Sequence, residues 1–160
     1  MGRKFFSGKK LIYIENTFFI YNKPLGQGKN AKGKARQSLE EKIMIAAKAT
    51  GVTLSEHSNI AILIDIIRDK ANINFPDIDN LVKPLLDSLK GIAYHDDSQV
   101  RSLQVNYLEE PSNAGAVDGD IHPPYLPLFA TWHDEAKKYP VIFISIGKVG
   151  HDHRFGQWMS

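Results

Sequence analysis

The residues best suited to chemistry gather in one short acidic segment. Asp77 and Asp79 are two positions apart, Lys83 follows four positions later, and the pair Asp96-Asp97 comes after a mostly apolar stretch. Carboxylates near a core are costly unless a cation compensates them, and hard divalent metals such as Mg²⁺ prefer oxygen ligands. A lysine beside such a site can neutralise charge that develops on a phosphate during phosphodiester cleavage. The segment therefore indicates metal-dependent chemistry on a phosphodiester.

Asp77, Asp79 and Asp97 are the expected metal ligands, with Asp96 as an alternative or supporting acid. In an extended segment, residues two positions apart project on one face, so Asp77 and Asp79 would point the same way. The Asp96-Asp97 pair arrives after one helix, which can return the chain to the same end of a sheet. The alternative from spacing alone is that the first two acids cap a helix and the later pair forms a polar turn.

Lys83 is expected to lie between the metal carboxylates and the scissile phosphate. Asp79, Lys83 and Asp87 recur at intervals of four residues, so they would share one face of a continuous helix. The alternative is an ordinary stripe of ion pairs along that helix. Asp87 is interpreted as structural.

In this order, the residues resemble the RusA family of Holliday junction resolvases. The family pattern is D-x-D-N-x-x-K, a helix ending in D-x-L-x-G, and then a D-D pair. This chain has those three elements at residues 77–83, 87–91 and 96–97. The resemblance covers about residues 17–110 and resumes at 140–147.

The resemblance implies a small dimeric endonuclease that cuts four-way DNA junctions in recombination and repair, with Mg²⁺ or Mn²⁺ as cofactor. It implies that Asp77, Asp79 and Asp97 hold the metal and that Lys83 is functionally important. Two alternatives remain open. One is a non-catalytic DNA-binding recombination accessory protein that retains the fold, against which the intact acidic set argues. The other is a nuclease that acts on flaps or other branched DNA.

Length and composition fit one cytoplasmic domain spanning residues 1–160. The hydrophobic fraction of 42% and the charged fraction of 24% are close to globular averages. The absence of cysteine excludes disulfides and thiolate metal sites. The apolar run from Leu11 to Tyr21 is interrupted by polar residues and is too short to cross a bilayer, so no membrane association is expected.

The net charge of +2 conceals a basic N-terminal arm and loop, residues 1–36, which hold nine Lys or Arg and a single acid, Glu15. Such a segment is a candidate for binding DNA phosphates, and its alternative is a solvated basic arm. Phe75 could stack on an unpaired base, although a buried phenylalanine at a strand end is more common. The expected DNA contacts are Lys23, Lys29, Lys32, Lys34, Arg36, Phe75 and Asn80.

The segment Gly28 to Lys34 matches the G-x-x-x-x-G-K core of a nucleotide-binding P-loop. Ala35 stands where a P-loop needs Ser or Thr to hold Mg²⁺. No nucleotide cofactor is therefore expected, and a loop that presents cations to DNA phosphates is the better interpretation.

The pattern of apolar residues predicts an α/β (α+β) fold, with a mixed sheet of about four strands and two main helices in the order β-α-β-α-β-β. Leu11 to Ile14 would pair with the first strand or extend it. Ser38 and Glu41 predict a capping box at the start of the first helix. Pro84 predicts that the second helix becomes regular only at Asn80 or Leu81. The strands are expected over 17–22, 60–67, 99–108 and 141–146, the helices over 38–49 and 80–90, and a long excursion over 111–139.

Two of these elements carry a clear burial pattern. The near-continuous apolar run from Ile60 to Ile67 predicts a strand that is covered on both faces. The first helix should place Leu39, Ile43 and Ala46/Ala47 on one face and end at Gly51.

Overall fold

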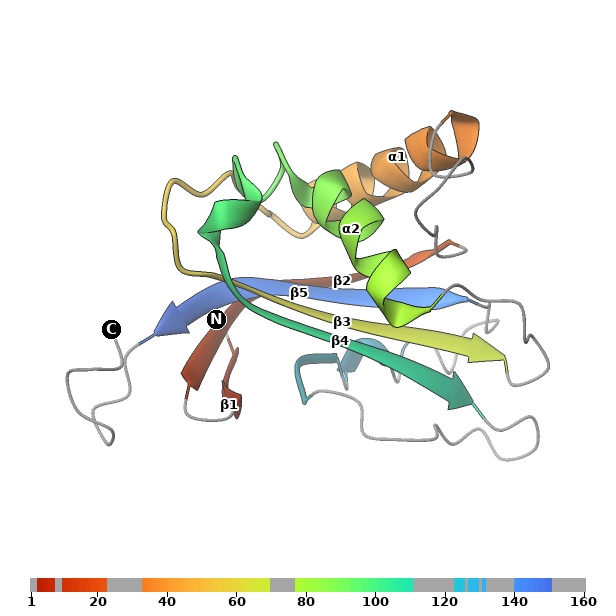
Figure 1. Cartoon of the computed structure of the whole chain (residues 1–160). Coiled ribbons are helices and arrows are strands. Elements are labelled where there is room, and N and C mark those ends of the chain that lie inside the picture. The colour runs from red at the N-terminus through yellow and green to blue at the C-terminus, as the bar shows by residue number, and fades with distance from the viewer. Residues whose placement is uncertain are drawn as a thin grey trace.

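A five-stranded mixed sheet with two helices on one face organises the chain (Figure 1). The computed structural model describes residues 3–7, 10–22, 33–69, 77–110, 123–125, 127–129, 131 and 140–150. The strands are β1 (Arg3–Ser7), β2 (Lys10–Tyr21), β3 (Ile60–Asp69), β4 (Val100–Glu110) and β5 (Val141–Gly150), and the main helices are α1 (Lys34–Ala49) and α2 (Ile78–Leu89). Two 3₁₀ helices are η2 (Asp97–Gln99) and η3 (Pro123–Tyr125).

The strand order is β1-β2-β5-β3-β4. Only β3 and β4 run parallel, and every other neighbouring pair is antiparallel. The parallel pair requires a crossover, which α2 and η2 supply. The expected mixed sheet with two main helices is confirmed, and β1 is the additional strand.

The interior strand β3, which lies between β5 and β4, is buried on both faces. Its residues from Ile60 through Ile67 are all buried, as the continuous apolar run predicted. Ile62 and Ile64 belong to the core on the helix side, whereas Leu63 and Ile67 belong to the core on the other side. Alternate residues of one strand thus serve two separate cores.

Each helix packs one apolar stripe against the sheet. The buried residues of α1 include Leu39, Ile43 and Ala47, which confirms the face predicted for this helix. Those of α2 include Leu81, Leu85 and Leu89. These stripes repeat every four residues, so the polar positions between them, including Lys83 and Asp87, turn away from the core.

Both helices begin earlier than expected. α1 starts at Lys34, with Gly33 as its N-cap at φ 84°, a conformation that glycine adopts readily. Ser38 and Glu41 therefore lie inside the helix, and the predicted capping box is wrong. Gly51, also at positive φ, follows the C-cap Thr50 and ends α1 as predicted.

The second helix begins at Ile78 and not at Asn80 or Leu81. The backbone N–H of Asn80 donates to the carbonyl of Asp77 at 3.0 Å, which closes the first turn ahead of Pro84. Pro84 is buried inside the helix and removes one backbone hydrogen bond, the one that the Asn80 carbonyl would accept. The loss of that single bond does not prevent the helix from beginning two or three residues earlier than expected.

The described part of the basic N-terminal arm forms two strands. The alternative in which Leu11 to Ile14 extend the first strand is confirmed, since β2 runs from Lys10 to Tyr21 with an irregularity between Ile14 and Asn16. β1 pairs antiparallel with the start of β2 and was not predicted. Its two phenylalanines stand among Arg3, Lys4 and further lysines, and this charge obscured the strand pattern.

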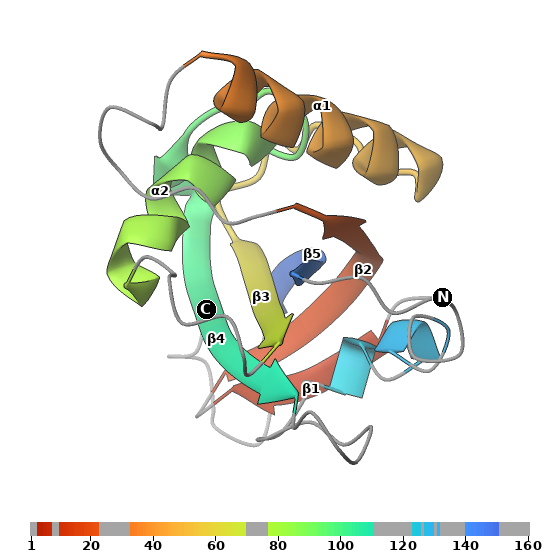
Figure 2. The ribbon, with the colours of Figure 1, turned by 90° about the vertical axis from the view of Figure 1, so that its right-hand side faces the viewer.

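On the sheet face opposite the helices, η3 covers the second core (Figure 2). Its Tyr125 is buried against Phe143 and donates a hydrogen bond from its hydroxyl to the carbonyl of Leu63. Most of the excursion over 111–139 lies outside the described residues. Within the described part of the chain, neither helix is long and apolar enough to cross a membrane.

Gly147→Ala should destabilise the fold by about 1–3 kcal/mol or more, measured by thermal or chemical unfolding. A Cβ there would lie 1.9 Å from the Tyr13 carbonyl oxygen and 2.8 Å from the Ile14 Cα, both backbone atoms of the paired strand. Gly150→Ala is the matched control. Its Cβ would meet the half-exposed Tyr13 ring, which can rotate away, so the loss should be smaller. Equal stability of both variants would contradict the β2–β5 register.

Candidate active site

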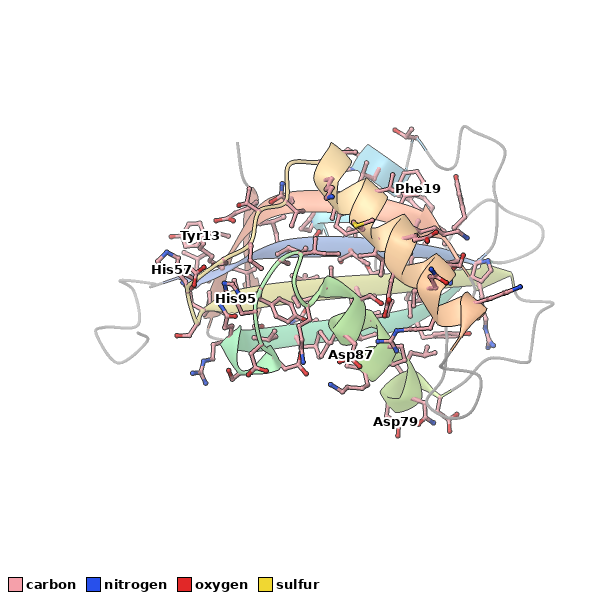
Figure 3. The ribbon with its side chains drawn as sticks, turned by 90° about the horizontal axis from the view of Figure 1, so that it is seen from above. Tyr13, Phe19, His57, Asp79, Asp87 and His95 are labelled. Carbon is pink, nitrogen blue, oxygen red and sulfur yellow. The ribbon has the colours of Figure 1, made fainter. Side chains whose placement is uncertain are left out.

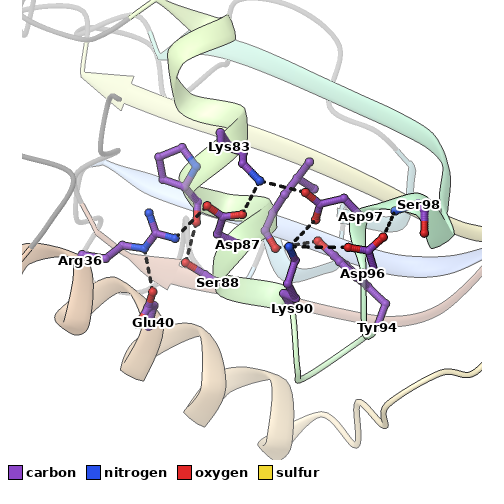
Figure 4. A network of polar contacts seen from close by, with 12 residues as sticks. Arg36, Glu40, Lys83, Asp87, Ser88, Lys90, Tyr94, Asp96, Asp97 and Ser98 are labelled. Carbon is purple, nitrogen blue, oxygen red and sulfur yellow. Dashed lines mark hydrogen bonds and ion pairs between the residues drawn. The ribbon is translucent and has the colours of Figure 1, made fainter. Parts of the chain in front are cut away.

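A lysine from the middle of α2 joins the two halves of the acidic segment (Figure 4). The Lys83 Nζ lies 2.7 Å from Asp87 Oδ1, one helical turn further on, and 3.0 Å from Asp97 Oδ2 at the start of η2. Lys83 is thus shared between two carboxylates that lie ten residues apart in the sequence. The Lys83–Asp87 pair of the expected stripe and the contact with the D-D pair are both present.

Further cations flank this pair of acids. Arg36, in the first turns of α1, approaches the second oxygen of Asp87 at 3.3 Å and holds Glu40 at 2.8 Å. Lys90, the C-cap of α2, lies 3.8 Å from Asp97 Oδ1 and 3.9 Å from Asp96 Oδ1. We call this set the charge cluster: Arg36, Glu40, Lys83, Asp87, Lys90, Asp96 and Asp97.

Hydrogen bonding within the charge cluster shifts its pKa values. The pKa of Lys83 is raised by its hydrogen bonds to Asp87 and then to Asp97, which favour the charged ammonium. Burial raises the pKa of Asp87, but hydrogen bonds from Lys83 and Arg36 outweigh burial and hold that pKa below its ordinary value. The side chain and backbone of Ser98 lower the pKa of Asp96. Lys83, Asp87 and Asp96 therefore stay ionised at neutral pH.

The turn that carries Asp96 and Asp97 is fixed by one buried amide. Gln99 Oε1 accepts from the backbone N–H groups of His95 (2.6 Å) and Asp96 (3.0 Å). Its Nε2 donates at 2.8 Å to the carbonyls of Ser55 and His57. These four hydrogen bonds hold the acidic turn to the segment that follows α1. The D-x-x-Q spacing of a capping box was the signal for this residue, and sequence reasoning missed it.

Tyr94 supports the same turn from beneath α2. Its ring is fully buried, and its hydroxyl donates to the carbonyl of Leu86 at 2.7 Å. Burial raises the pKa of Tyr94, with a smaller contribution from the nearby carboxylates. The turn is therefore anchored to α2 as well as to the segment after α1.

The first two acids of the motif lie at the start of α2, where Asp79 is labelled in Figure 3. Asp77 is the N-cap residue and is exposed, but its side chain makes no capping hydrogen bond. Asp79 is exposed in the first turn, and its Oδ1 accepts from the N–H of Asn80 at 3.0 Å. The expected extended approach through both acids is wrong at Asp79, which is helical, so the two-residue spacing does not put both side chains on one face.

Asp97 has the features of a metal ligand, but a complete set of ligands is not assembled. Its Oδ1 is buried and accepts no hydrogen bond. A carboxylate oxygen of this kind suits a hard divalent cation. Among the described residues, no three acidic or histidine side chains converge closely enough to hold a metal ion. Asp79 lies one helical turn before Lys83 on α2. The Lys83 ammonium forms an ion pair with Asp97 Oδ2.

A comparison with models of protein families identifies the family to which the chain belongs. A family model described as endodeoxyribonuclease RusA matches residues 28–116, which is more than half of the chain. The chain belongs to the RusA family. The resemblance carried by the acidic motif is confirmed, and membership indicates an endodeoxyribonuclease. No curated protein gives a significant match to the chain.

The RusA match includes the charge cluster and every residue expected to contact DNA except Lys23. Lys34 is exposed at the first position of α1, and Asn80 is partly exposed beside Asp79. Arg36 is also in the match, but in this structure it contacts Glu40 and Asp87. The other expected DNA contacts lie outside the described residues: Lys23, Lys29, Lys32 and Phe75.

Gln99→Met should destabilise this RusA-family fold by at least about 2 kcal/mol, because four hydrogen bonds of roughly 0.5–1.5 kcal/mol each are lost. Chemical unfolding measures the loss. Gln37→Met, the same chemical change at an exposed position of α1, is the control and should be nearly neutral. If both variants unfold alike, Gln99 does not hold the acidic turn.

Proposed function

We propose that this RusA-family chain is a Mg²⁺-dependent endonuclease that resolves Holliday junctions by phosphodiester hydrolysis, in recombination and repair of DNA in the cytoplasm. One observation carries the proposal. The lysine of the D-x-D-N-x-x-K motif lies 3.0 Å from the second aspartate of the D-D pair, so one residue of the first half of the motif contacts the second half. Family membership also supports the endodeoxyribonuclease activity.

In this proposal Asp77, Asp79 and Asp97 hold Mg²⁺, which Mn²⁺ can replace. When bound, the metal would supply an activated water and stabilise the leaving oxygen. The buried Oδ1 of Asp97, which accepts no hydrogen bond and has Lys90 at 3.8 Å, supports its part. Asp96 has a supporting part, because its Oδ2 already accepts from the N–H of Ser98 and it caps η2.

Lys83 has two tasks in the proposed mechanism. Without metal, its ammonium compensates Asp97 and limits the repulsion between carboxylates. With DNA bound, the same charge stabilises the negative charge that develops on the reacting phosphate. Its half-exposed position allows this exchange, because one side of the ammonium faces solvent where a phosphate could approach.

DNA affinity in this proposal comes from the basic segment that leads into α1. Lys34 is exposed, and with Lys23, Lys29 and Lys32 it would neutralise phosphates without reading sequence. Arg36 and Asn80 would contact the backbone nearer the acids. Phe75 would stack on a base at the branch point, where bases are easily unstacked.

We further propose that the protein acts as a homodimer. A four-way junction presents two symmetric strands for cleavage, and a two-fold dimer would place one charge cluster on each. Light scattering should give twice the chain mass at micromolar concentration. A monomer, both free and with junction DNA, would contradict the dimer without affecting the proposed chemistry.

A single gel assay tests the proposed function. The protein is incubated with a synthetic four-way junction, a flap, and a linear duplex of matched sequence, in Mg²⁺, Mn²⁺ or excess chelator. We expect metal-dependent cleavage of the junction and intact duplex. Preferred cleavage of the flap would assign a different branched substrate. Binding to the junction without cleavage in either metal would favour a DNA-binding accessory protein.

Asp79→Asn and Asp97→Asn should each abolish junction cleavage but preserve or tighten junction binding. Each change removes charge that the metal needs and also removes repulsion from DNA phosphates. Cleavage and electrophoretic mobility shift on the same preparations separate the two effects. Glu41→Asn, at an exposed position of α1, is the control and should leave both unchanged. Near-normal turnover of Asp79→Asn would overturn its assignment as a ligand.

Lys83→Ala should lower single-turnover cleavage more than junction affinity, because its charge matters most while charge develops on the phosphate. We expect a loss of about 10²-fold or more in rate, the size seen when one transition-state donor is removed. Lys90→Ala is the comparison, since Lys90 lies further from the carboxylates. A loss confined to affinity would make Lys83 a phosphate anchor.

A further inference from the structure

The Lys83 ammonium is divided between two carboxylates with different surroundings. Asp97 is a proposed metal ligand, whereas Asp87 lies one turn further along α2 and is contacted by Arg36. The two contacts have similar lengths, 2.7 Å to Asp87 and 3.0 Å to Asp97, so a small movement of the lysine would favour either acid. Nothing in the proposed function gives Asp87 or its contact with Arg36 a part.

We propose that Asp87 is a positioning residue that draws Lys83 away from Asp97 and so opens Asp97 to a metal ion, and that Arg36 limits this pull. The inference rests on the proposed metal site.

The reason is competition for the Asp97 carboxylate. A metal ion and the Lys83 ammonium would compete for Asp97 Oδ2. A lysine that lost Asp97 and gained nothing would leave an unpaired ammonium beside an incoming cation, which costs Coulomb energy. Asp87 already holds the same ammonium at 2.7 Å, so Lys83 can leave Asp97 without losing its countercharge.

Arg36 weakens the attraction of the Asp87 carboxylate for the Lys83 ammonium. Its guanidinium lies 3.3 Å from Asp87 Oδ2 and neutralises part of the charge that attracts Lys83. Glu40 in turn holds Arg36 at 2.8 Å and fixes it on α1. The pKa of Asp87 is held below its ordinary value by Lys83 and Arg36 together, so the carboxylate remains charged and available to both cations. Removal of Arg36 should therefore have the opposite effect from removal of the Asp87 charge.

The test measures Mn²⁺ affinity in the absence of DNA, by calorimetry or by the paramagnetic signal of free Mn²⁺, at low salt. Asp87→Asn should weaken Mn²⁺ binding about two- to fivefold, the size expected when one exposed ion pair is gained or lost. Arg36→Gln should tighten it by a similar factor. Asp87→Glu, which retains the charge one turn from Lys83, should restore most of the affinity.

A Lys83→Met background separates positioning from simple charge. Any change in net charge near the site alters cation affinity, with or without Lys83. If Asp87 acts through Lys83, Asp87→Asn and Arg36→Gln should have little effect on Mn²⁺ binding when Met occupies position 83. Equal effects in both backgrounds would overturn the inference, because charge alone would explain them.

Two further measurements serve as controls. Glu41→Gln removes one acid from an exposed position of α1 and should leave Mn²⁺ affinity unchanged. Unfolding curves for every variant establish that the comparison is made on folded protein. No effect of Asp87→Asn on a wild-type protein that binds Mn²⁺ would refute the positioning role. A wild-type protein that binds no Mn²⁺ into the millimolar range would instead refute the proposed metal site.

Discussion

The burial of β3 on both faces is the constraint on which the other elements depend. A strand that is buried at every position from Ile60 to Ile67, and apolar at all of them except Asp65, must be covered on two sides. On one side, α1 and α2 lie across the sheet, and on the other η3 closes a second core. The crossover from β3 to its parallel neighbour β4 has to pass over the helix side, and α2 with η2 makes that passage. The charge cluster lies on this crossover, except for Arg36 and Glu40 on the neighbouring α1, so the core determines where it lies.

Within the charge cluster, the alternation of acidic and basic side chains determines the position of each cation more than any single contact does. Acids and bases alternate from Glu40 through Arg36, Asp87 and Lys83 to Asp97, across two helices and a turn. Exposed ion pairs of this kind stabilise a fold only slightly. Their effect here is one of position, because each cation is shared and its location depends on the balance between two neighbours. Such a cluster changes readily when a new cation or a phosphate arrives.

Sequence reasoning succeeded where one interaction dominates and failed where several compete. The apolar run of β3 and the stripe Leu39, Ile43 and Ala47 follow from burial alone, and both were predicted. The start of α2 was missed because Pro84 costs one hydrogen bond, which the buried leucines of the same helix offset. The contact between Lys83 and Asp97 could be anticipated only through the family motif, since spacing cannot show which side chains a turn brings back.

Other parts of the site carry no signal strong enough to read in advance. Gln99 looks like one polar residue among several, and only the fold shows that its amide joins two segments more than forty residues apart. Arg36 looked like part of a basic loop that contacts DNA. It is helical and pairs with Asp87 because α1 begins four residues earlier than the expected Ser38 boundary. The capping pattern of Ser38 and Glu41 does not start the helix, because Gly33 in its positive-φ conformation is the N-cap.

The proline in α2 has a consequence for how the first turn of that helix opens and closes. Residues 78–81 are tied to the next turn by one backbone hydrogen bond fewer than in an uninterrupted helix, because position 84 has no N–H to offer the Asn80 carbonyl. Local opening of a helix end needs less free energy when fewer bonds must break together. Asp79 therefore stands on a segment that can unwind briefly while Lys83 and the buried leucines stay in place. α2 thus holds Lys83 in its stable middle part and Asp79 at an end that opens more easily.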